Sequence, residues 1–377
     1  MAGLKILHVA PHLRQGGAER LLFELATHPS DGTTHHVALM QDEVFFDRSG
    51  LQIEELGFDL KRRFGALTHL PASRRRLRAL IERLKPDVVQ GWLYYGAFLS
   101  LSLSNRTPVV WSIHNTTFPR LLANPLLHLV DRVLAARSRQ APDAVVYCAA
   151  SARAFHEARG YAPERGLVID NGVDLALFRP DPARRAVRRA GLGLPDDAFI
   201  VLLSARNDPQ KDLPNCLDAF ALFRREVPEA RLLLAGRGMD DSDAALRAMI
   251  AARDLGPAVL SLGAVADMPG LLDAADAVLL GSRYGEAMPM ALLEALAMGK
   301  PIAATRVGDI GRLPCPGEAL APPGDPRSLA SALSFARAGD PRWAASFAEA
   351  RAHYGLDRMT RTYDALYRRL AAREPAP

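Results

Sequence analysis

Two glutamates in the stretch YGEAMPMALLEALAMGK, residues 284–300, have a spacing and a setting that suit ligand binding. Glu286 precedes a proline, and Glu294 lies in a run of Ala, Leu and Met that we expect to be helical from Pro289 to Met298. In one continuous helix the two carboxylates would lie about 12 Å apart, but with Glu286 in a loop they can converge on one ligand. A carboxylate accepts paired hydrogen bonds from vicinal hydroxyls, as on ribose or a hexose. The alternative is that Glu286 is a helix-start charge and Glu294 an exposed helix residue.

The start of the same helix is a candidate anion site. Pro289 suits the first turn, where a missing N–H costs nothing. The backbone N–H groups of Ala287, Met288 and Met290 would then point at an anion, helped by the helix dipole.

Two cations follow a predicted strand in SARNDPQKDLPNCLDAF, residues 204–220. Arg206 and Lys211 lie after the strand and before a helix that begins near Pro214. Fixed cations at the carboxyl end of a strand suit a diphosphate, which Arg binds as a fork and Lys as a point charge. The segment lacks the GxxxxGK[ST] pattern of a P-loop, and a solvated loop is the alternative.

Two further sites are marked by glycine or histidine in the first half of the chain. PHLRQGGAERLL places Gly16 and Gly17 between the first strand and the first helix, where backbone can approach a ligand closely or simply turn tightly. WSIHNTTF places His114 at the end of a strand, where it could hydrogen-bond a sugar hydroxyl or assist proton movement. A lone histidine in that position is also commonly structural.

Glycine-rich strand ends recur in the second half, in LLLAGRGMD and LGAVADMPGLL. We expect the loops with Gly236, Arg237 and Val265 to offer backbone groups to a flat base. The sequence has no GxGxxG, no HExxH and no clustered Cys and His, so we predict neither dinucleotide binding nor a metal site.

The elements that must position these residues alternate along the chain. Strand-like runs are separated by helical patterns, which predicts parallel sheets covered on both faces and two doubly wound α/β domains. The expected strands are 5–9, 36–40, 87–90, 109–113, 144–148 and 167–170, then 199–204, 231–235, 259–262, 277–280 and 301–304. The expected helices include 18–27, 70–84, 122–139, 214–225, 243–253 and 289–298, with a helical tail over 343–373.

The domain boundary is expected in the turn- and proline-rich segment NGVDLALFRPDP. We therefore predict an N-terminal domain over 1–172, a linker over 173–195, a C-terminal domain over 196–350 and a final helix over 351–377. In open α/β sheets ligands bind outside the carboxyl ends of the strands, so a cleft between the two domains is the expected site.

The composition indicates the class of protein and the expected compartment. The 377 residues are 49% hydrophobic and 24% charged, which is ordinary for a globular protein of two domains. Three widely spaced cysteines indicate reduced thiols in a cytoplasm, and we find neither a signal peptide nor a transmembrane run.

The net charge is +5, with basic clusters at 61–63, 74–78 and 184–189. These clusters are either solvated helix faces or contacts to anionic lipid headgroups or a phosphorylated acceptor. They have no interleaved aromatic residues, which argues against nucleic acid.

Taken in order, the motifs resemble the family 4, or group 1, retaining glycosyltransferases, and the resemblance covers nearly the whole chain. The residues that carry it are GGAERLL, PDVVQGW, VVWSIHNT, IDNGVD, NDPQKD, LLLAGRG, ADMPGLLDAADAVLLGSRYGEAMPMALLEALAMGKPIAATRVGD and LAPPGDPRSL. The closer likeness is to bacterial members that build capsule, exopolysaccharide or O-antigen polysaccharide.

The resemblance implies the GT-B architecture, in which two Rossmann-like domains face each other and a C-terminal helix crosses back. The N-terminal domain would bind the acceptor and the C-terminal domain the nucleotide-sugar. Arg206 and Lys211 would hold the donor diphosphate, Glu294 the ribose and Glu286 the transferred sugar. Gly17 would approach the phosphate or sugar from the other domain, and His114 would lie beside the sugar.

The implied reaction moves a hexose from a nucleotide-sugar to a glycan or polyprenyl-diphosphate-linked acceptor, with retention and without metal or cofactor. UDP-sugars are favoured over GDP-sugars, and any contact with the inner face of an anionic membrane would be peripheral. The alternatives are a nucleotide-sugar 2-epimerase of similar fold and a catalytically silent nucleotide-sugar-binding partner. Two departures from the family pattern affect the site: Ala287 stands where glycine is common, and IGRLPCPGEAL is unlike the usual form.

Overall fold

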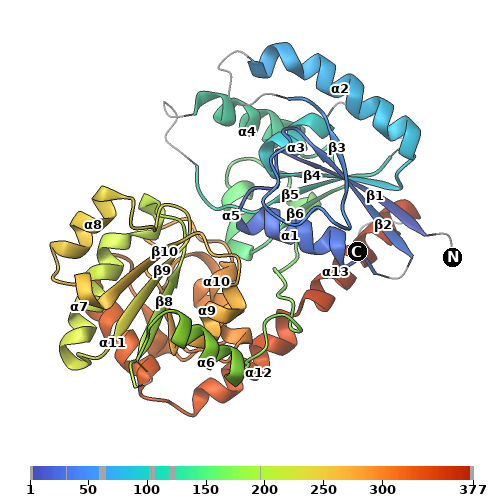
Figure 1. The fold of residues 1–377 in the computed structure, drawn as a ribbon. Helices are drawn as coiled ribbons and strands as arrows, with labels where there is room; N and C mark the ends of the chain where they lie inside the picture. Colours follow the sequence, from blue (N-terminus) through green and yellow to red (C-terminus); the bar gives the residue numbers. More distant parts are fainter. Residues whose placement is uncertain are drawn as a thin grey trace. The chain divides into compact units, whose positions relative to one another are not determined.

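The computed structural model describes residues 3–30, 32–58, 65–101, 103, 107–118, 124–195 and 197–373, with side chains from residue 69 onward in the third of these ranges. The chain divides into two compact units (Figure 1), and each is described by itself. One is Met1–Gly172 together with Leu356–Pro377, and the other is Val173–Gly355. The basic cluster at 61–63, the expected helix start at Leu122 and residue 196, where the second domain was expected to begin, lie outside the described residues.

The first unit is built on a seven-stranded sheet of order β3-β2-β1-β4-β5-β6-β7, in which all pairs are parallel. Its interior strands are almost wholly buried, as strands covered on both faces must be. The parallel sheet predicted from the alternating pattern is thus confirmed. The strands are β1 (Leu4–Ala10), β2 (Thr33–Leu39), β3 (Gln52–Glu55), β4 (Val88–Trp92), β5 (Val109–Ile113), β6 (Ala144–Tyr147) and β7 (Gly166–Val168).

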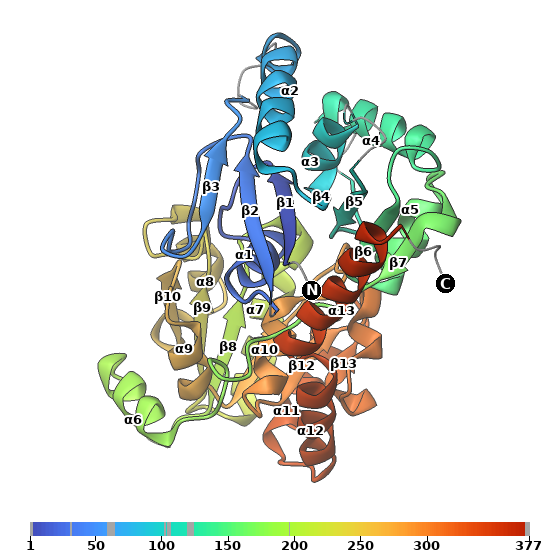
Figure 2. The ribbon, with the colours of Figure 1, turned by 90° about the vertical axis from the view of Figure 1, so that its right-hand side faces the viewer.

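Helices cover this sheet closely. Helix α3 packs on β1, β4 and β5, and a Cβ at Gly96 would collide with the carbonyl oxygen of Val9, so glycine is needed for that approach. Helix α1 lies beside β2 (Figure 2). The helices are α1 (Gly17–Thr27), α2 (Gly65–Leu84), α3 (Leu93–Ser100), α4 (Pro125–Arg137) and α5 (Ala150–Glu157).

The second unit holds a six-stranded sheet of order β10-β9-β8-β11-β12-β13, again parallel throughout. Its strand order reverses between β8 and β11, the position at which ligands of open α/β sheets bind. The strands are β8 (Ile200–Ser204), β9 (Arg231–Ala235), β10 (Val259–Gly263), β11 (Ala277–Leu280), β12 (Ile302–Thr305) and β13 (Leu320–Ala321). The helices are α6 (Pro182–Gly191), α7 (Leu213–Glu226), α8 (Ala244–Ala251), α9 (Met268–Ala274), α10 (Met290–Ala297), α11 (Pro326–Arg337) and α12 (Arg342–His353).

The segment 173–195, which the sequence suggested as a linker, groups with the second unit and contains α6. Arg185 donates to the carbonyl oxygens that end α9 and, at 2.5 Å, to Asp276. Arg189 is buried and donates to Asp276 at 2.6 Å, while Arg184 pairs with Asp273. These three arginines of the cluster at 184–189 therefore hold α6 against α9, and are neither a fully solvated face nor available to lipid.

The helical tail is two helices rather than one. Helix α12 ends ahead of Gly355, whose backbone pairs with Val173, and α13 (Leu356–Ala371) then belongs to the first unit. The Tyr367 hydroxyl of α13 donates to Gln90 on β4, and Thr33 donates to Asp364 at 2.8 Å. The C-terminal helix thus returns to the first unit, as the predicted fold class requires.

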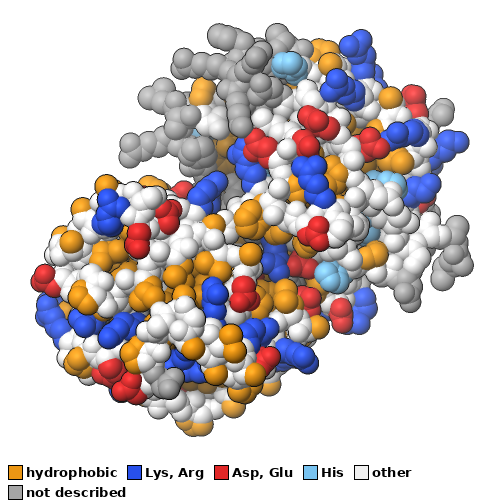
Figure 3. All heavy atoms as spheres, in the orientation of Figure 1, with side chains coloured by type: hydrophobic (Ala, Val, Ile, Leu, Met, Phe, Trp, Pro, Cys, Tyr) orange, Lys and Arg blue, Asp and Glu red, His pale blue; other side chains and the backbone are white. Residues whose placement is uncertain are grey.

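Three further observations concern the surface charges, the cysteines and the hydropathy of the helices. On the face that Figure 3 shows, basic and acidic side chains are interspersed over each unit. Cys148 and Cys216 are buried, and Cys315 is half-buried. Among the described residues, no helix combines the length and the apolarity that crossing a membrane needs.

Candidate functional site

The candidate site of the second unit lies at the carboxyl ends of β8 and β11. The loop after β8 carries Arg206 and Lys211, and the loop after β11 carries Glu286. Because the two strands are neighbours and parallel, both loops leave the same edge of the sheet.

Lys211 and Glu286 form a buried ion pair between Nζ and Oε1, with side chains only 14% and 6% exposed. The same Oε1 accepts a hydrogen bond of 2.5 Å from the Ser282 hydroxyl. Thr305 on β12 in turn donates to the carbonyl oxygen of Ser282 at 2.5 Å. The structure therefore brings two of the predicted residues into direct contact, although prediction had assigned them to separate parts of one ligand.

Backbone bonds fix the two loops against each other. Asp208 caps a short 3-10 turn, η2 (Pro209–Lys211), by accepting from the backbone N–H of Gln210 at 2.9 Å. The Gln210 side-chain amide donates to the carbonyl oxygen of Gly285 at 3.0 Å, and the Gln210 backbone carbonyl oxygen accepts from the Arg283 N–H at 2.8 Å. The approach of Lys211 to Glu286 is therefore set by rigid loops rather than by a flexible side chain alone.

Helix α10 begins one residue later than expected. Pro289 is its N-cap, with φ −72° and ψ 121°, and Met290 is its first residue. Ala287 and Met288 are buried in the loop ahead of it. Glycine is not required at residue 287, because the left-handed conformation falls instead on Gly285, with φ 78°. The Ala287 substitution in the family pattern thus carries no backbone strain.

Glu294 is buried within α10, with 7% of its surface exposed, between Leu293 and the fully buried Leu296. The alternative of an exposed helix glutamate is therefore wrong. Glu286, with 5% of its surface exposed, is buried in the loop ahead of the helix. Burying a carboxylate costs free energy, so two buried carboxylates around the start of one helix make this edge of the sheet a candidate binding site.

Arg206 is exposed, and its loop rests on the glycine-rich loop after β9. A Cβ on Gly236, which has φ 137°, would collide with the carbonyl oxygen of Ala205. The Asn207 N–H donates to the Arg237 carbonyl at 2.9 Å, and the Gly236 N–H donates to Gly263 at 2.7 Å. The loops after β8, β9 and β10 are thereby joined.

The remaining predicted residues of the second unit lie around these loops. Arg237 is exposed, and the half-buried Val265 follows β10 in the loop that leads to α9. Both follow strand ends at the same edge of the sheet as Lys211 and Glu286.

In the first unit His114 follows β5 and stacks on Trp92, with ring centroids 5.1 Å apart and planes 11° from parallel. Its two ring nitrogens are buried and have no hydrogen-bond partner among the described residues. Burial lowers the pKa of His114 to about 4, so the imidazole is neutral near pH 7. It can thus exchange hydrogen bonds with a hydroxyl but does not supply a cation.

Trp92 is held by a buried histidine pair. Its indole Nε1–H donates to His8 Nδ1 at 3.0 Å, which places the His8 proton on Nε2. His8 Nε2 then donates to His35 Nδ1 at 2.7 Å. Burial lowers the pKa of both histidines, that of His35 to about 4, which matches these neutral tautomers.

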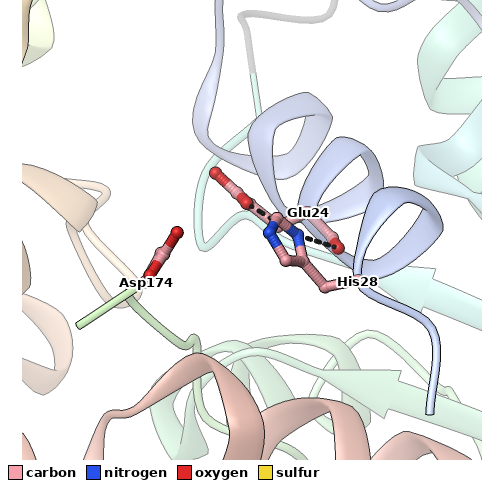
Figure 4. A group of neighbouring side chains, drawn as sticks. All are labelled: Glu24, His28 and Asp174. Carbon is pink, nitrogen blue, oxygen red and sulfur yellow. Dashed lines mark hydrogen bonds and ion pairs between the residues drawn. The ribbon is translucent and has the colours of Figure 1, made fainter. Parts of the chain in front are cut away.

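Gly16 and Gly17 also belong to the first unit, where they cap and begin α1. Gly16 is extended, with φ −173°, and a Cβ there would meet the end of the flexible Glu19 side chain, which can move aside. Further along α1, Glu24 pairs with His28 at 3.3 Å, one turn apart (Figure 4).

Sequence reasoning missed Ser282. The signal was its position four residues before Glu286 and two residues after the end of the predicted strand 277–280. Its role depends on the loop conformation that turns both side chains to the same point.

The comparisons with known proteins match both halves of the chain. Residues 15–177 match the family described as Glycosyltransferase Family 4, and residues 198–336 match Glycosyl transferases group 1. The chain belongs to the family 4 glycosyltransferases. The predicted resemblance is thereby confirmed.

Curated relatives of this family 4 glycosyltransferase include two proteins named D-inositol 3-phosphate glycosyltransferase. That of Thermobispora bispora is 38% identical over 157 residues, or 39% of this chain and 36% of its own length. That of a Nocardioides species is 31% identical over 188 residues, or 45% of this chain and 40% of its own. The matched part of the chain therefore spans well under half of the length of these relatives.

Solved structures share the fold over nearly the whole chain. HepE of Anabaena, in complex with UDP, has a TM-score of 0.80 at 22% identity and covers 96% of this chain and 99% of its own. Sucrose-phosphate synthase of Thermosynechococcus elongatus has a TM-score of 0.80 at 20% identity, covering 98% and 100%. WaaG, a glycosyltransferase involved in lipopolysaccharide biosynthesis, has a TM-score of 0.71 at 16% identity, covering 96% and 99%. The GT-B fold class expected from the sequence is confirmed.

Proposed function

We propose that this family 4 glycosyltransferase is a hexosyltransferase that moves a sugar, with retention and without metal, from a nucleotide-sugar to a glycan or polyprenyl-diphosphate-linked acceptor. The observation that carries the proposal is the Lys211–Glu286–Ser282 cluster at the strand-order reversal of the second unit. A cation and a hydrogen-bonded carboxylate side by side suit a ligand that joins a diphosphate to a sugar.

The donor is assigned to the second unit. Arg206 and Lys211 would bind the diphosphate, aided by the backbone N–H groups at the start of α10. Glu286 would bind hydroxyls of the transferred sugar and Glu294 those of the ribose, while the loops with Gly236, Arg237 and Val265 would border the base. A UDP-sugar is favoured over a GDP-sugar, because fold neighbours of this chain were solved with UDP and with UDP-glucose.

The proposed reaction breaks the bond between the sugar C1 and the diphosphate oxygen and forms a bond from C1 to the acceptor oxygen. Arg206, Lys211 and the α10 N-terminus stabilise the charge that develops on the leaving diphosphate. The acceptor's hydroxyl proton passes to the departing phosphate oxygen on the same face of the sugar, so the configuration is retained. No protein base and no metal is required in this scheme.

The acceptor is assigned to the first unit. His114 is neutral and its ring nitrogens are buried, so it would exchange hydrogen bonds with the transferred sugar. Gly17, exposed at the start of α1, leaves room for the donor phosphate or sugar.

We further propose that the acceptor is linked to a membrane. Arg75 and Arg78 are exposed on α2, where they could attract anionic headgroups at the inner face of a membrane. The fold neighbour WaaG is a glycosyltransferase involved in lipopolysaccharide biosynthesis. Such contact would be peripheral.

The proposal is tested by nucleotide release from a panel of UDP- and GDP-sugars, with and without excess chelator. Lys211→Ala should lower release by about a hundredfold or more, since one charge-stabilising donor is lost. Arg253→Ala, which removes a cation paired with Asp218 in the same unit, is the matched control and should leave release unchanged. Full release by Lys211→Ala would overturn the diphosphate assignment, and loss of release in chelator would overturn the metal-free scheme.

A further inference from the structure

The Glu286 carboxylate is engaged on one oxygen by two donors of different kinds. Oε1 accepts from the Lys211 ammonium and from the Ser282 hydroxyl. Ser282 and Thr305 are completely buried, and the Thr305 hydroxyl holds the Ser282 backbone through its carbonyl oxygen. The hydroxyl is thus fixed to the sheet edge, whereas the ammonium ends a long side chain.

This arrangement sets up a competition at Lys211. A diphosphate that binds Lys211 must draw the ammonium away from Glu286 or share it with a carboxylate that repels the phosphate. Glu286 is 5% exposed, so its charge would lose its cation in a place where water solvates it poorly. Ser282 is a donor that stays on Oε1 after the cation has moved.

We infer that Lys211 exchanges Glu286 for the donor diphosphate, and that Ser282 is the positioning residue that keeps Glu286 in place through this exchange. The inference rests on the proposed function. It adds a coupling between binding of the donor diphosphate and binding of the transferred sugar. Binding of the diphosphate frees Glu286 Oε1 from the ammonium, so the carboxylate becomes available to sugar hydroxyls when the leaving group is in place.

The exchange predicts opposite effects of two substitutions on one measurement. Glu286→Gln removes the charge that competes for Lys211, so the affinity for UDP or GDP should rise by about fivefold. Ser282→Ala leaves Glu286 more dependent on Lys211, so the same affinity should fall by about fivefold. Sugar transfer should fall in both variants, because Glu286 is absent in one and misplaced in the other.

The double variant separates positioning from a general structural role. In the Glu286→Gln background the hydroxyl no longer holds a carboxylate, so adding Ser282→Ala should not change nucleotide affinity. A merely structural role for Ser282 would weaken binding equally in both backgrounds. Ser282→Thr, which keeps a hydroxyl, should restore the affinity of the parent chain.

The experiment is calorimetric titration of the full chain and its variants with UDP and with GDP, after thermal unfolding has shown that each variant is folded. If Ser282→Ala does not fold, Ser282→Cys places a weaker donor at the same position and carries the same expectation. Failure of the unsubstituted chain to bind either nucleotide would overturn the proposed function. Nucleotide binding that is unchanged or weaker in Glu286→Gln would overturn the exchange alone, and equal losses on changing Ser282 in both backgrounds would overturn the positioning role.

Discussion

Several side chains of the candidate site are charged at buried positions where folding alone would favour apolar residues. Glu294 lies in α10 with Leu293 and Leu296 beside it, in a position where an apolar residue would pack without the desolvation cost of a carboxylate. Lys211 and Glu286 are likewise buried where a hydrophobic pair of similar volume would be equally stable or more so. Folding alone does not explain three charged groups around the start of one helix.

The ribose role of Glu294 is testable by binding. Glu294→Ala should weaken the affinity for UDP or GDP by about tenfold or more, because the charged acceptor of two hydroxyl hydrogen bonds is lost. Glu294→Gln keeps one acceptor oxygen and should weaken it less. Titration calorimetry gives both values, and Glu229→Ala on the surface of the same unit is the control. Equal nucleotide affinity in Glu294→Ala and the unsubstituted chain would remove Glu294 from the ribose.

At the same scale, the sequence indicated candidate residues but did not indicate which of them contact each other. The residue types and strand-end positions of Arg206, Lys211, Glu286 and Glu294 suffice to predict a binding site. The ion pair between Lys211 and Glu286 joins residues 75 positions apart, and no local pattern specifies it. Ser282 went unnoticed for the same reason, since a serine after a strand is usually unremarkable until the loop's path is known.

Among the elements, α6 shows how an arginine cluster can be misread. A run of arginines on a short helix suggests a solvated or lipid-binding face. In the structure Arg185 and Arg189 share the carboxylate of Asp276, which also accepts from the Ile200 N–H at 2.7 Å. The cluster therefore joins α6, the end of α9 and the start of β8.

The contacts between α6 and Asp276 predict that substitutions lower the stability of the protein only on the side of α6 that faces Asp276. Arg189→Met should lower the free energy of unfolding by about 2 kcal/mol, because the half-buried Asp276 carboxylate then loses one of its two arginine partners. Val187→Ala on the same helix, where the side chain is 74% exposed, should change it by less than about 0.5 kcal/mol. Urea unfolding measures both, and equal effects would show that Arg189 does not anchor the helix.

The elements that the sequence predicted well are those buried on both faces. The strands expected at 109–113, 231–235 and 277–280 have the observed bounds, because continuous apolar runs between turns leave little choice. The edge strands β3 and β13 were missed, since QIEE is largely polar and Leu320–Ala321 is only two residues long. The division of the tail into α12 and α13 was missed because the break at Gly355 depends on pairing with Val173, far away in the sequence.

Across the whole molecule, histidines are distributed unequally between the units. The second unit contains only His353, and the other nine belong to the first. Burial lowers the pKa of His35, His114 and His156 to about 4. It lowers the pKa of His8 well below the ordinary value. His8 and His35 lie on the neighbouring strands β1 and β2, so the middle of the first sheet holds two neutral imidazoles, while His114 follows β5 and His156 lies on α5.

Acid should therefore destabilise the first unit before the second. Between about pH 6.5 and pH 4 these histidines are protonated in the unfolded chain but neutral in the folded one, so the free energy of unfolding falls as pH falls through this window. Each contributes at most about 1.4 kcal/mol per pH unit, and the loss ends below the folded pKa. Calorimetry at pH 7 and pH 5 should show one transition moving to lower temperature. The other transition should move much less. The fluorescence of Trp92 and Trp111 should follow the first transition, and that of Trp343 the second.

His35→Gln should reduce the acid shift of the first transition, whereas His353→Gln should not. Equal acid shifts of both transitions would contradict the assignment.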